Sequence, residues 1–185
     1  MEINSNFKVE AIKTDGVNNT RTQTIKSVSD SETKIYNYQV VNHYPHSKKH
    51  YTQGLEYYKG FFYEGTGEYG TSGLYKVNVN SGKTLQSSEL DDKYFGEGIT
   101  VLNDKIYQLT YRSGTGFVYQ LEDFALIDSF QIHSSTKEGW GLTNDGTNLI
   151  MSDGSHILTW IDPNDFSVIK TLQVANNKDI IYYLN

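Results

Sequence analysis

Three segments of the sequence place a side chain that could take part in catalysis or binding directly before a glycine. These side chains are Gln53, Glu97 and Trp140, and they recur at intervals of about 43 residues. A carboxyl group can move protons as a general acid or base, an amide can donate and accept hydrogen bonds, and an indole can form an apolar wall. Because the three positions are equivalent in a repeat, we expect them to face one shared site.

The elements that position these side chains are predicted to be short strands. From residue 36 onward, aromatic and β-branched runs alternate with turns rich in Gly, Asn and Asp, which is typical of successive strands. In the second repeat a strand opens at Gly98, and three more are expected at Lys105–Leu109, Gly116–Leu121 and Ala125–Ile132. A further strand is expected at Ile35–His43, ahead of the first repeat.

Four strands per unit at this period are typical of a β-propeller blade. A β-sandwich would show the turns without the period. The repeats fill about residues 51–174, whereas a propeller has about 4–8 blades. We therefore expect an all-β propeller that is incomplete as written, with about three to three and a half blades. Residues 1–34 are polar and without periodicity, so we expect a mobile leader or linker there and a partial propeller domain over residues 35–185.

The amino-acid composition excludes some classes of function. The chain has 22 acidic and 16 basic residues, a formal net charge of −6, which argues against a nucleic-acid surface. It has no cysteine, so thiol catalysis and thiolate metal sites are excluded. No apolar run approaches the length of about 20 residues that a membrane span needs. The 15 Tyr and 8 Phe favour half-buried strands.

Two other patterns could suggest chemistry. His43, His46 and His50 lie close together in the sequence, but no matching carboxylate is evident, so we expect no metal site. The segment Ser152–Ser155 lacks the Gly-x-Ser-x-Gly pattern of a serine hydrolase, and we expect a turn there.

Six segments carry a specific family resemblance. They are YTQGL, DDKYFGEGIT, KIYQLTY, EGWGLTNDG, SDGS and IDPNDFSVIKTL. In this order and spacing, residues 36–185 resemble the glutamine cyclotransferase family, the glutaminyl cyclases of plant latex and their bacterial relatives. The resemblance implies a five-bladed β-propeller that converts the N-terminal glutamine of peptide substrates to pyroglutamate with release of ammonia. It implies no metal and no other cofactor, and a secreted or periplasmic location.

The resemblance also implies roles for individual residues. Glu97, in the Gly-Glu-Gly motif, is similar to the catalytic acid/base of the family. The implied substrate-binding residues are Gln53, Trp140, Tyr51 (where Phe is usual), Tyr111 (where Trp is usual) and Asn185. Asn185 matches the Asn of a Leu-Asn-Glu-Leu-Glu motif whose remaining residues have no counterpart here. We therefore expect the last one and a half to two blades to be absent, and the chain alone to be poorly soluble, oligomeric or inactive.

The chemistry explains why one carboxyl group could be enough. In cyclisation the α-amine of the substrate attacks its own γ-carboxamide, so the enzyme needs no nucleophile. Glu97 would take a proton from the amine and deliver it to the leaving nitrogen. Burial among aromatic groups would raise its pKa toward neutrality.

Two alternatives stay open. The first is a non-catalytic propeller, a binding or scaffold module that keeps the fold without a working pocket. The second is a glycosidase that uses Glu97 together with Glu64 or Glu138, although the sequence has no distinctive paired-acid pattern.

Overall fold

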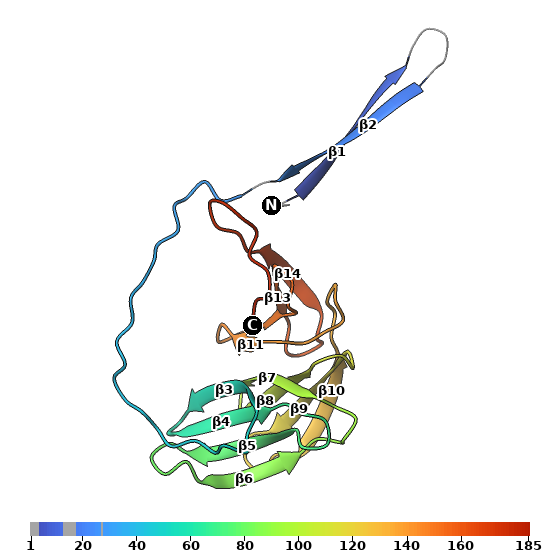
Figure 1. The fold of residues 1–185 in the computed structure, drawn as a ribbon. Coiled ribbons are helices and arrows are strands. Elements are labelled where there is room, and N and C mark those ends of the chain that lie inside the picture. The colour runs from blue at the N-terminus through green and yellow to red at the C-terminus, as the bar shows by residue number, and fades with distance from the viewer. Residues whose placement is uncertain (1–3, 13–17, 27) are drawn as a thin grey trace.

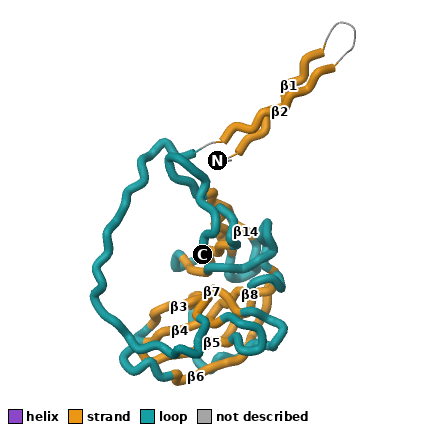
Figure 2. The backbone as a smooth tube through the Cα atoms, viewed as in Figure 1, coloured by secondary structure: helices purple, strands orange, loops and turns teal. Residues whose placement is uncertain are grey.

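The computed structural model describes residues 4–12, 18–26 and 28–185, and this part of the chain consists of strands β1 to β14 joined by turns and loops (Figures 1 and 2). It contains no helix within these residues, and hence none long and apolar enough to cross a membrane. The predicted all-β class is confirmed.

Twelve of the strands form three separate four-stranded antiparallel sheets, each a simple meander. Blade 1 contains β3 (Thr52–Tyr58), β4 (Phe61–Thr66), β5 (Gly73–Asn78) and β6 (Thr84–Glu89). Blade 2 contains β7 (Gly96–Leu102), β8 (Lys105–Thr110), β9 (Thr115–Gln120) and β10 (Leu126–Gln131). Blade 3 contains β11 (Leu142–Asn144), β12 (Leu149–Ser152), β13 (Ile157–Ile161) and β14 (Val168–Gln173). The predicted propeller-type repeat of four strands is confirmed.

Blade 2 is buried on both faces because it lies between the other two blades. Side chains alternate between the faces of a strand, so the neighbours Ile106 and Tyr107 on β8 belong to different cores. Ile106 packs toward blade 1 with Leu74, and Tyr107 packs toward blade 3 with Met151. The strand β7, which carries Glu97, is buried along its whole length. The carboxyl of Glu97 therefore lies on the most buried strand of the three blades.

The innermost strands β3, β7 and β11 lie side by side, and glycine makes their close approach possible. A Cβ atom built on Gly98 would lie only 2.5 Å from the backbone nitrogen of Leu142 and from the carbonyl oxygen of Trp140. The Gly98 N–H instead donates a 2.8 Å hydrogen bond to that Trp140 carbonyl. The two positions before the glycines, Glu97 on β7 and Trp140 in the segment that leads into β11, therefore lie close together.

A polar network ties the same three strands together. Thr100 Oγ1 on β7 donates to Glu56 Oε2 on β3 over 2.7 Å. Asn144 Nδ2 on β11 donates to Thr100 Oγ1 over 2.8 Å. Because each of the three strands contributes one residue, the network fixes the positions of these strands relative to one another.

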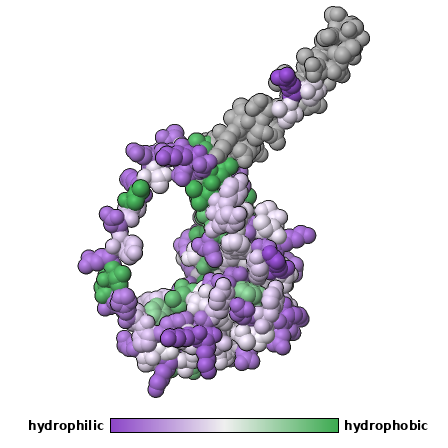
Figure 3. Space-filling model, viewed as in Figure 1, coloured by the Kyte–Doolittle hydropathy of each residue, from purple (hydrophilic) through white to green (hydrophobic). Residues whose placement is uncertain are grey.

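The residues before blade 1 differ from the sequence expectation. β1 (Asn4–Ile12) and β2 (Asn18–Lys26) form an antiparallel hairpin that projects from the blades (Figure 1). The strand predicted at Ile35–His43 is wrong, because this segment has no strand conformation and Ile35 is 91% exposed. The segment connects the hairpin to blade 1 as a loop, and hydrophobic residues lie on its surface (Figure 3). The boundary predicted between residues 34 and 35 stays a prediction.

Candidate active site

One pocket of about 260 Å³ brings together all six side chains predicted for the site. Its lining consists of Tyr51, Gln53, Phe95, Glu97, Tyr111, Trp140 and Asn185. The sequence pattern missed Phe95, although this residue directly precedes the Gly-Glu-Gly motif. Aromatic rings therefore form most of the wall around a single carboxyl group and two amides.

Different blades contribute these groups. Gln53 lies on β3, Glu97 lies on β7, and Trp140 lies two residues before the start of β11. Asn185 reaches the pocket from the far end of the described chain, because Gly141 leaves room for it. A Cβ atom on Gly141 would lie 2.7 Å from the Asn185 carbonyl carbon. The pocket is therefore a product of blade packing and not of one local motif.

Glu97 is held in a state that suits proton transfer. Its side chain is buried, and the residue is only 6% exposed. Burial disfavours the charged form, and the negative charge of Glu138 acts in the same direction, so together they raise the pKa of Glu97 to about 8. The carboxyl is therefore mainly protonated at pH 7 and ionises within reach of neutrality.

Glu138 links the pocket residues Trp140 and Tyr111 by way of Arg112. Its carboxylate accepts a 3.0 Å hydrogen bond from Trp140 Nε1 and a 2.9 Å hydrogen bond from Arg112 Nε. Arg112 also donates to the Tyr111 hydroxyl over 2.9 Å. Sequence reasoning considered Glu138 only as a second glycosidase acid and missed Arg112. The signal for both was their position, two residues before Trp140 and one after Tyr111.

The Glu138→Gln variant should lower the pKa of Glu97 from its value of about 8. Removing a nearby negative charge makes ionisation of Glu97 easier, while burial, the larger cause, keeps its pKa above the ordinary 4.5. A carboxyl-carbon NMR titration measures the change. Glu122→Gln, at an exposed position of blade 2, is the matched control and should leave the titration of Glu97 unmoved. An unchanged pKa in Glu138→Gln would exclude the electrostatic link.

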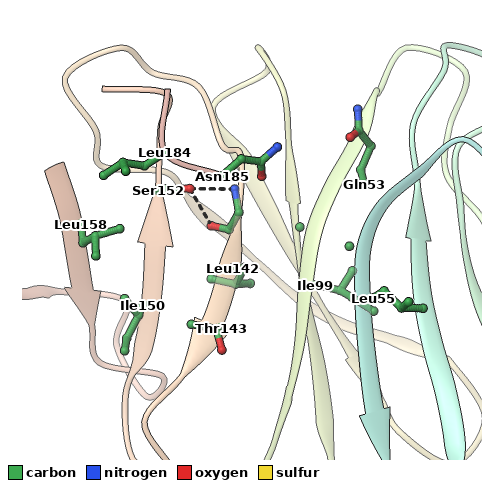
Figure 4. Close-up of a pocket in the computed structure, with 13 residues that line it drawn as sticks. Gln53, Leu55, Ile99, Leu142, Thr143, Ile150, Ser152, Leu158, Leu184 and Asn185 are labelled. Carbon is green, nitrogen blue, oxygen red and sulfur yellow. Dashed lines mark hydrogen bonds between the residues drawn. The ribbon is translucent and has the colours of Figure 1, made fainter. Parts of the chain in front are cut away.

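A second hollow of about 440 Å³ continues from the pocket along the inner strands (Figure 4). Gln53 and Asn185 line both spaces, and Leu55, Ile99 and Leu142 make the wall below them apolar (Figure 4). The two amides thus mark the boundary between an aromatic pocket and an apolar channel.

The Ser152–Ser155 segment has a structural role, as we expected from the sequence. Ser152 Oγ accepts a 2.9 Å hydrogen bond from the Gly141 N–H, and Asp153 accepts hydrogen bonds from both the backbone and the hydroxyl of Ser155. Gly154 lies in the left-handed region, with φ of 75°. The segment is a turn next to the pocket.

The histidines present a different picture from the sequence. We expected no metal site because no matching carboxylate was evident, but the structure places Glu64 against two of them. His46 Nε2 lies 2.7 Å from Glu64 Oε1, and His50 Nδ1 lies 2.8 Å from Glu64 Oε2. His43 is not part of this group.

The sequence of this chain is similar to that of proteins in one known family. The sequence model of the glutamine cyclotransferase family matches residues 11–185. Glutaminyl-peptide cyclotransferase of Arabidopsis thaliana is 36% identical over 164 residues, which are 88% of this chain and 51% of that protein. This chain therefore spans about half the length of that curated relative.

Solved structures agree on the fold. The crystal structure of Myxococcus xanthus glutaminyl cyclase matches with a TM-score of 0.69 and 27% identity, over 78% of this chain and 60% of that one. The WD40 β-propeller domain of Doa1 matches with a TM-score of 0.52 and 13% identity, over 69% of this chain and 40% of that one. The second likeness concerns the fold alone.

Proposed function

The chain belongs to the glutamine cyclotransferase family, and we propose from this and from its pocket that it serves to convert the N-terminal glutamine of peptides to pyroglutamate. The observation that carries the proposal is the buried carboxyl of Glu97, with its pKa raised to about 8, in a pocket walled by aromatic rings. Ammonia is the second product, and no step of the proposed reaction requires a metal ion.

The reaction begins with a proton transfer between matched groups. A peptide α-amine has a pKa of about 8, close to that of Glu97. When the substrate enters as an ammonium ion and Glu97 is ionised, transfer of one proton gives a neutral amine and a neutral carboxyl group at little cost in free energy. This neutral amine is the nucleophile.

Glu97 then serves as the acid. The amine nitrogen attacks the γ-carbonyl carbon, a new carbon–nitrogen bond forms, and the carbonyl oxygen gains negative charge. The proton lost by the attacking nitrogen passes through Glu97 to the amide nitrogen, the old carbon–nitrogen bond breaks, and ammonia leaves. The carbonyl forms again as part of the pyroglutamate ring. The proton that Glu97 first took from the substrate ammonium then passes to ammonia, which leaves as ammonium, and Glu97 is ionised again.

The other pocket groups support this cycle by position. Tyr51, Tyr111 and Trp140 line a space in which the glutamine side chain must fold back on its own amine, and holding reacting atoms together lowers the barrier. Gln53 and Asn185 carry amides that can hydrogen-bond the carboxamide of the substrate and its developing oxyanion.

Incubation of the chain with a short peptide that begins with Gln tests the proposal. Mass spectrometry should show loss of one ammonia at a rate well above that of the peptide alone. A peptide of the same sequence with an acetylated N-terminus should not change, because its nitrogen cannot attack. Binding of the free peptide without ammonia loss would favour the binding-module alternative, and absence of both would refute the proposed function.

A further inference from the structure

A second group of chemically competent side chains lies in blade 1, outside the pocket of Glu97. We name it the histidine–glutamate cluster, and its members are His46, His50 and Glu64. Their ligand atoms all lie within 4.8 Å of one another. Glu64 comes from β4 and is fully buried, whereas both histidines come from the irregular segment before β3. The cluster therefore joins a loop to the blade.

The donor set matches the preferences of a zinc-class cation. Two imidazoles and one carboxylate form the protein ligands of many zinc sites, and histidines separated by three residues are a common spacing. Tetrahedral bonds of about 2.0–2.1 Å would hold the ligand atoms about 3.3 Å apart. Small outward shifts from the present 2.7 Å and 2.8 Å contacts would open that space. The side chain of His46 is 45% exposed, which leaves solvent access for a water ligand.

The position of Glu64 supports the same interpretation. Its side chain is 1% exposed, and its two oxygens lie 2.7 Å and 2.8 Å from ring nitrogens of His46 and His50. A buried negative charge is costly unless a positive charge compensates it, and a divalent cation bound among these groups would supply that charge.

The repeat shows that this charge is particular to blade 1. Glu64 pairs with the residue that follows the glycine of the inner strand. The corresponding positions of blades 2 and 3 hold Gln108 and Met151, which are neutral. Both are buried, as Glu64 is. A carboxylate is therefore not required by the blade architecture, and it occurs in the blade where two histidines reach it.

Supporting contacts orient the ligands. Thr52 Oγ1 donates a 2.5 Å hydrogen bond to Glu64 Oε1, and the His50 ring lies against Tyr75 with a centroid distance of 4.2 Å. Such outer contacts fix the direction of metal ligands. On the same stretch of chain, Tyr51 and Gln53 point instead to the pocket of Glu97.

We propose that His46, His50 and Glu64 form a binding site for one zinc-class divalent cation, which anchors the segment before β3 to blade 1. The role is structural, since the cation would lie beside the pocket and not among its lining residues. This inference does not depend on the proposed cyclase function, because binding can be measured without turnover.

Zinc titration of the chain, monitored by calorimetry after treatment with a chelator, tests the site. We expect one zinc ion per chain, with affinity reduced at least about tenfold by either His46→Gln or His50→Gln and abolished in the double variant. Zinc should also raise the melting temperature of the wild type, since a ligand that binds only the folded state stabilises it, but not that of the double variant.

His43→Gln is the matched control, because this histidine lies in the same segment but outside the cluster. It should bind zinc as the wild type does. Circular dichroism shows whether each variant retains the strands. Failure of the wild type to bind zinc would overturn the proposal and leave the cluster as a hydrogen-bonded support, and undiminished binding by a folded double variant would overturn it by placing the metal elsewhere.

Discussion

Replacement of Glu97 by Gln should lower the rate of cyclisation by about 10²–10⁴-fold, the usual contribution of one general acid or base. The amide has nearly the same shape as the carboxyl group but cannot accept the proton of the attacking amine or pass it to the leaving nitrogen. Rates of ammonia release from a Gln-initiated peptide at saturating substrate measure the effect. A variant that retains near-normal turnover would exclude Glu97 from proton transfer.

The same variant should be more stable than the wild type at pH 8, which separates a chemical role from a folding defect. The pKa of Glu97 is about 8 in the folded chain against an ordinary 4.5. Below pH 4.5 the group is protonated in both states, and its ionisation costs the fold nothing. Between these values only the unfolded chain ionises, so wild-type stability falls by about 1.4 kcal/mol per pH unit from this group.

Denaturant titrations at pH 5 and pH 8 check this sign. The stability of Glu97→Gln relative to the wild type should increase between the two values, toward a difference of a few kcal/mol. Loss of activity together with loss of stability at both pH values would instead indicate that Glu97 supports the fold.

Gly98→Ala should destabilise the chain by about 2–4 kcal/mol, an effect at or above the usual range for overpacking. The new methyl group would meet the backbone nitrogen of Leu142 and the carbonyl oxygen of Trp140, both only 2.5 Å away. Neither atom belongs to a flexible side chain, so β7 and the segment before β11 must separate. The hydrogen bond from Gly98 N–H to Trp140 weakens at the same time.

Chemical unfolding followed by circular dichroism measures this loss. The matched control is Gly114→Asn, because Gly114 has φ of 67° and open space around its Cβ direction. Asn tolerates that backbone conformation better than other residues with a side chain, so the control should change stability by less than about 1 kcal/mol. Equal, small effects of both substitutions would contradict the account of inner-strand contact.

The repeat in the sequence predicts most of the fold and the core of the site for a physical reason. Strand alternation and turn residues are local signals, and the period aligns Gln53, Glu97 and Trp140 before any contact is known. The second-repeat strands expected from the sequence agree within a few residues with β8, β9 and β10. Equivalent positions on neighbouring blades face the same central space, so their side chains are expected to line one shared pocket.

Other features depend on contacts that no local pattern reveals. The run that includes Tyr36, Tyr38 and Val40 alternates as a strand would, but within the described chain it pairs with no strand, and its side chains are exposed. The sequence of the β1–β2 hairpin is polar and does not predict two strands. Glu64 on β4 contacts His50, which lies 14 positions earlier in the irregular segment before β3, and periodicity cannot predict this contact.

The most direct test is the ionisation of Glu97 itself, since the proposed chemistry depends on a carboxyl that burial in this pocket keeps protonated near neutral pH. Protein labelled with ¹³C at glutamate carboxyl carbons allows an NMR titration, and the signal absent from Glu97→Gln identifies the residue. We expect a titration midpoint at about pH 8. A midpoint near the ordinary 4.5 would contradict this expectation.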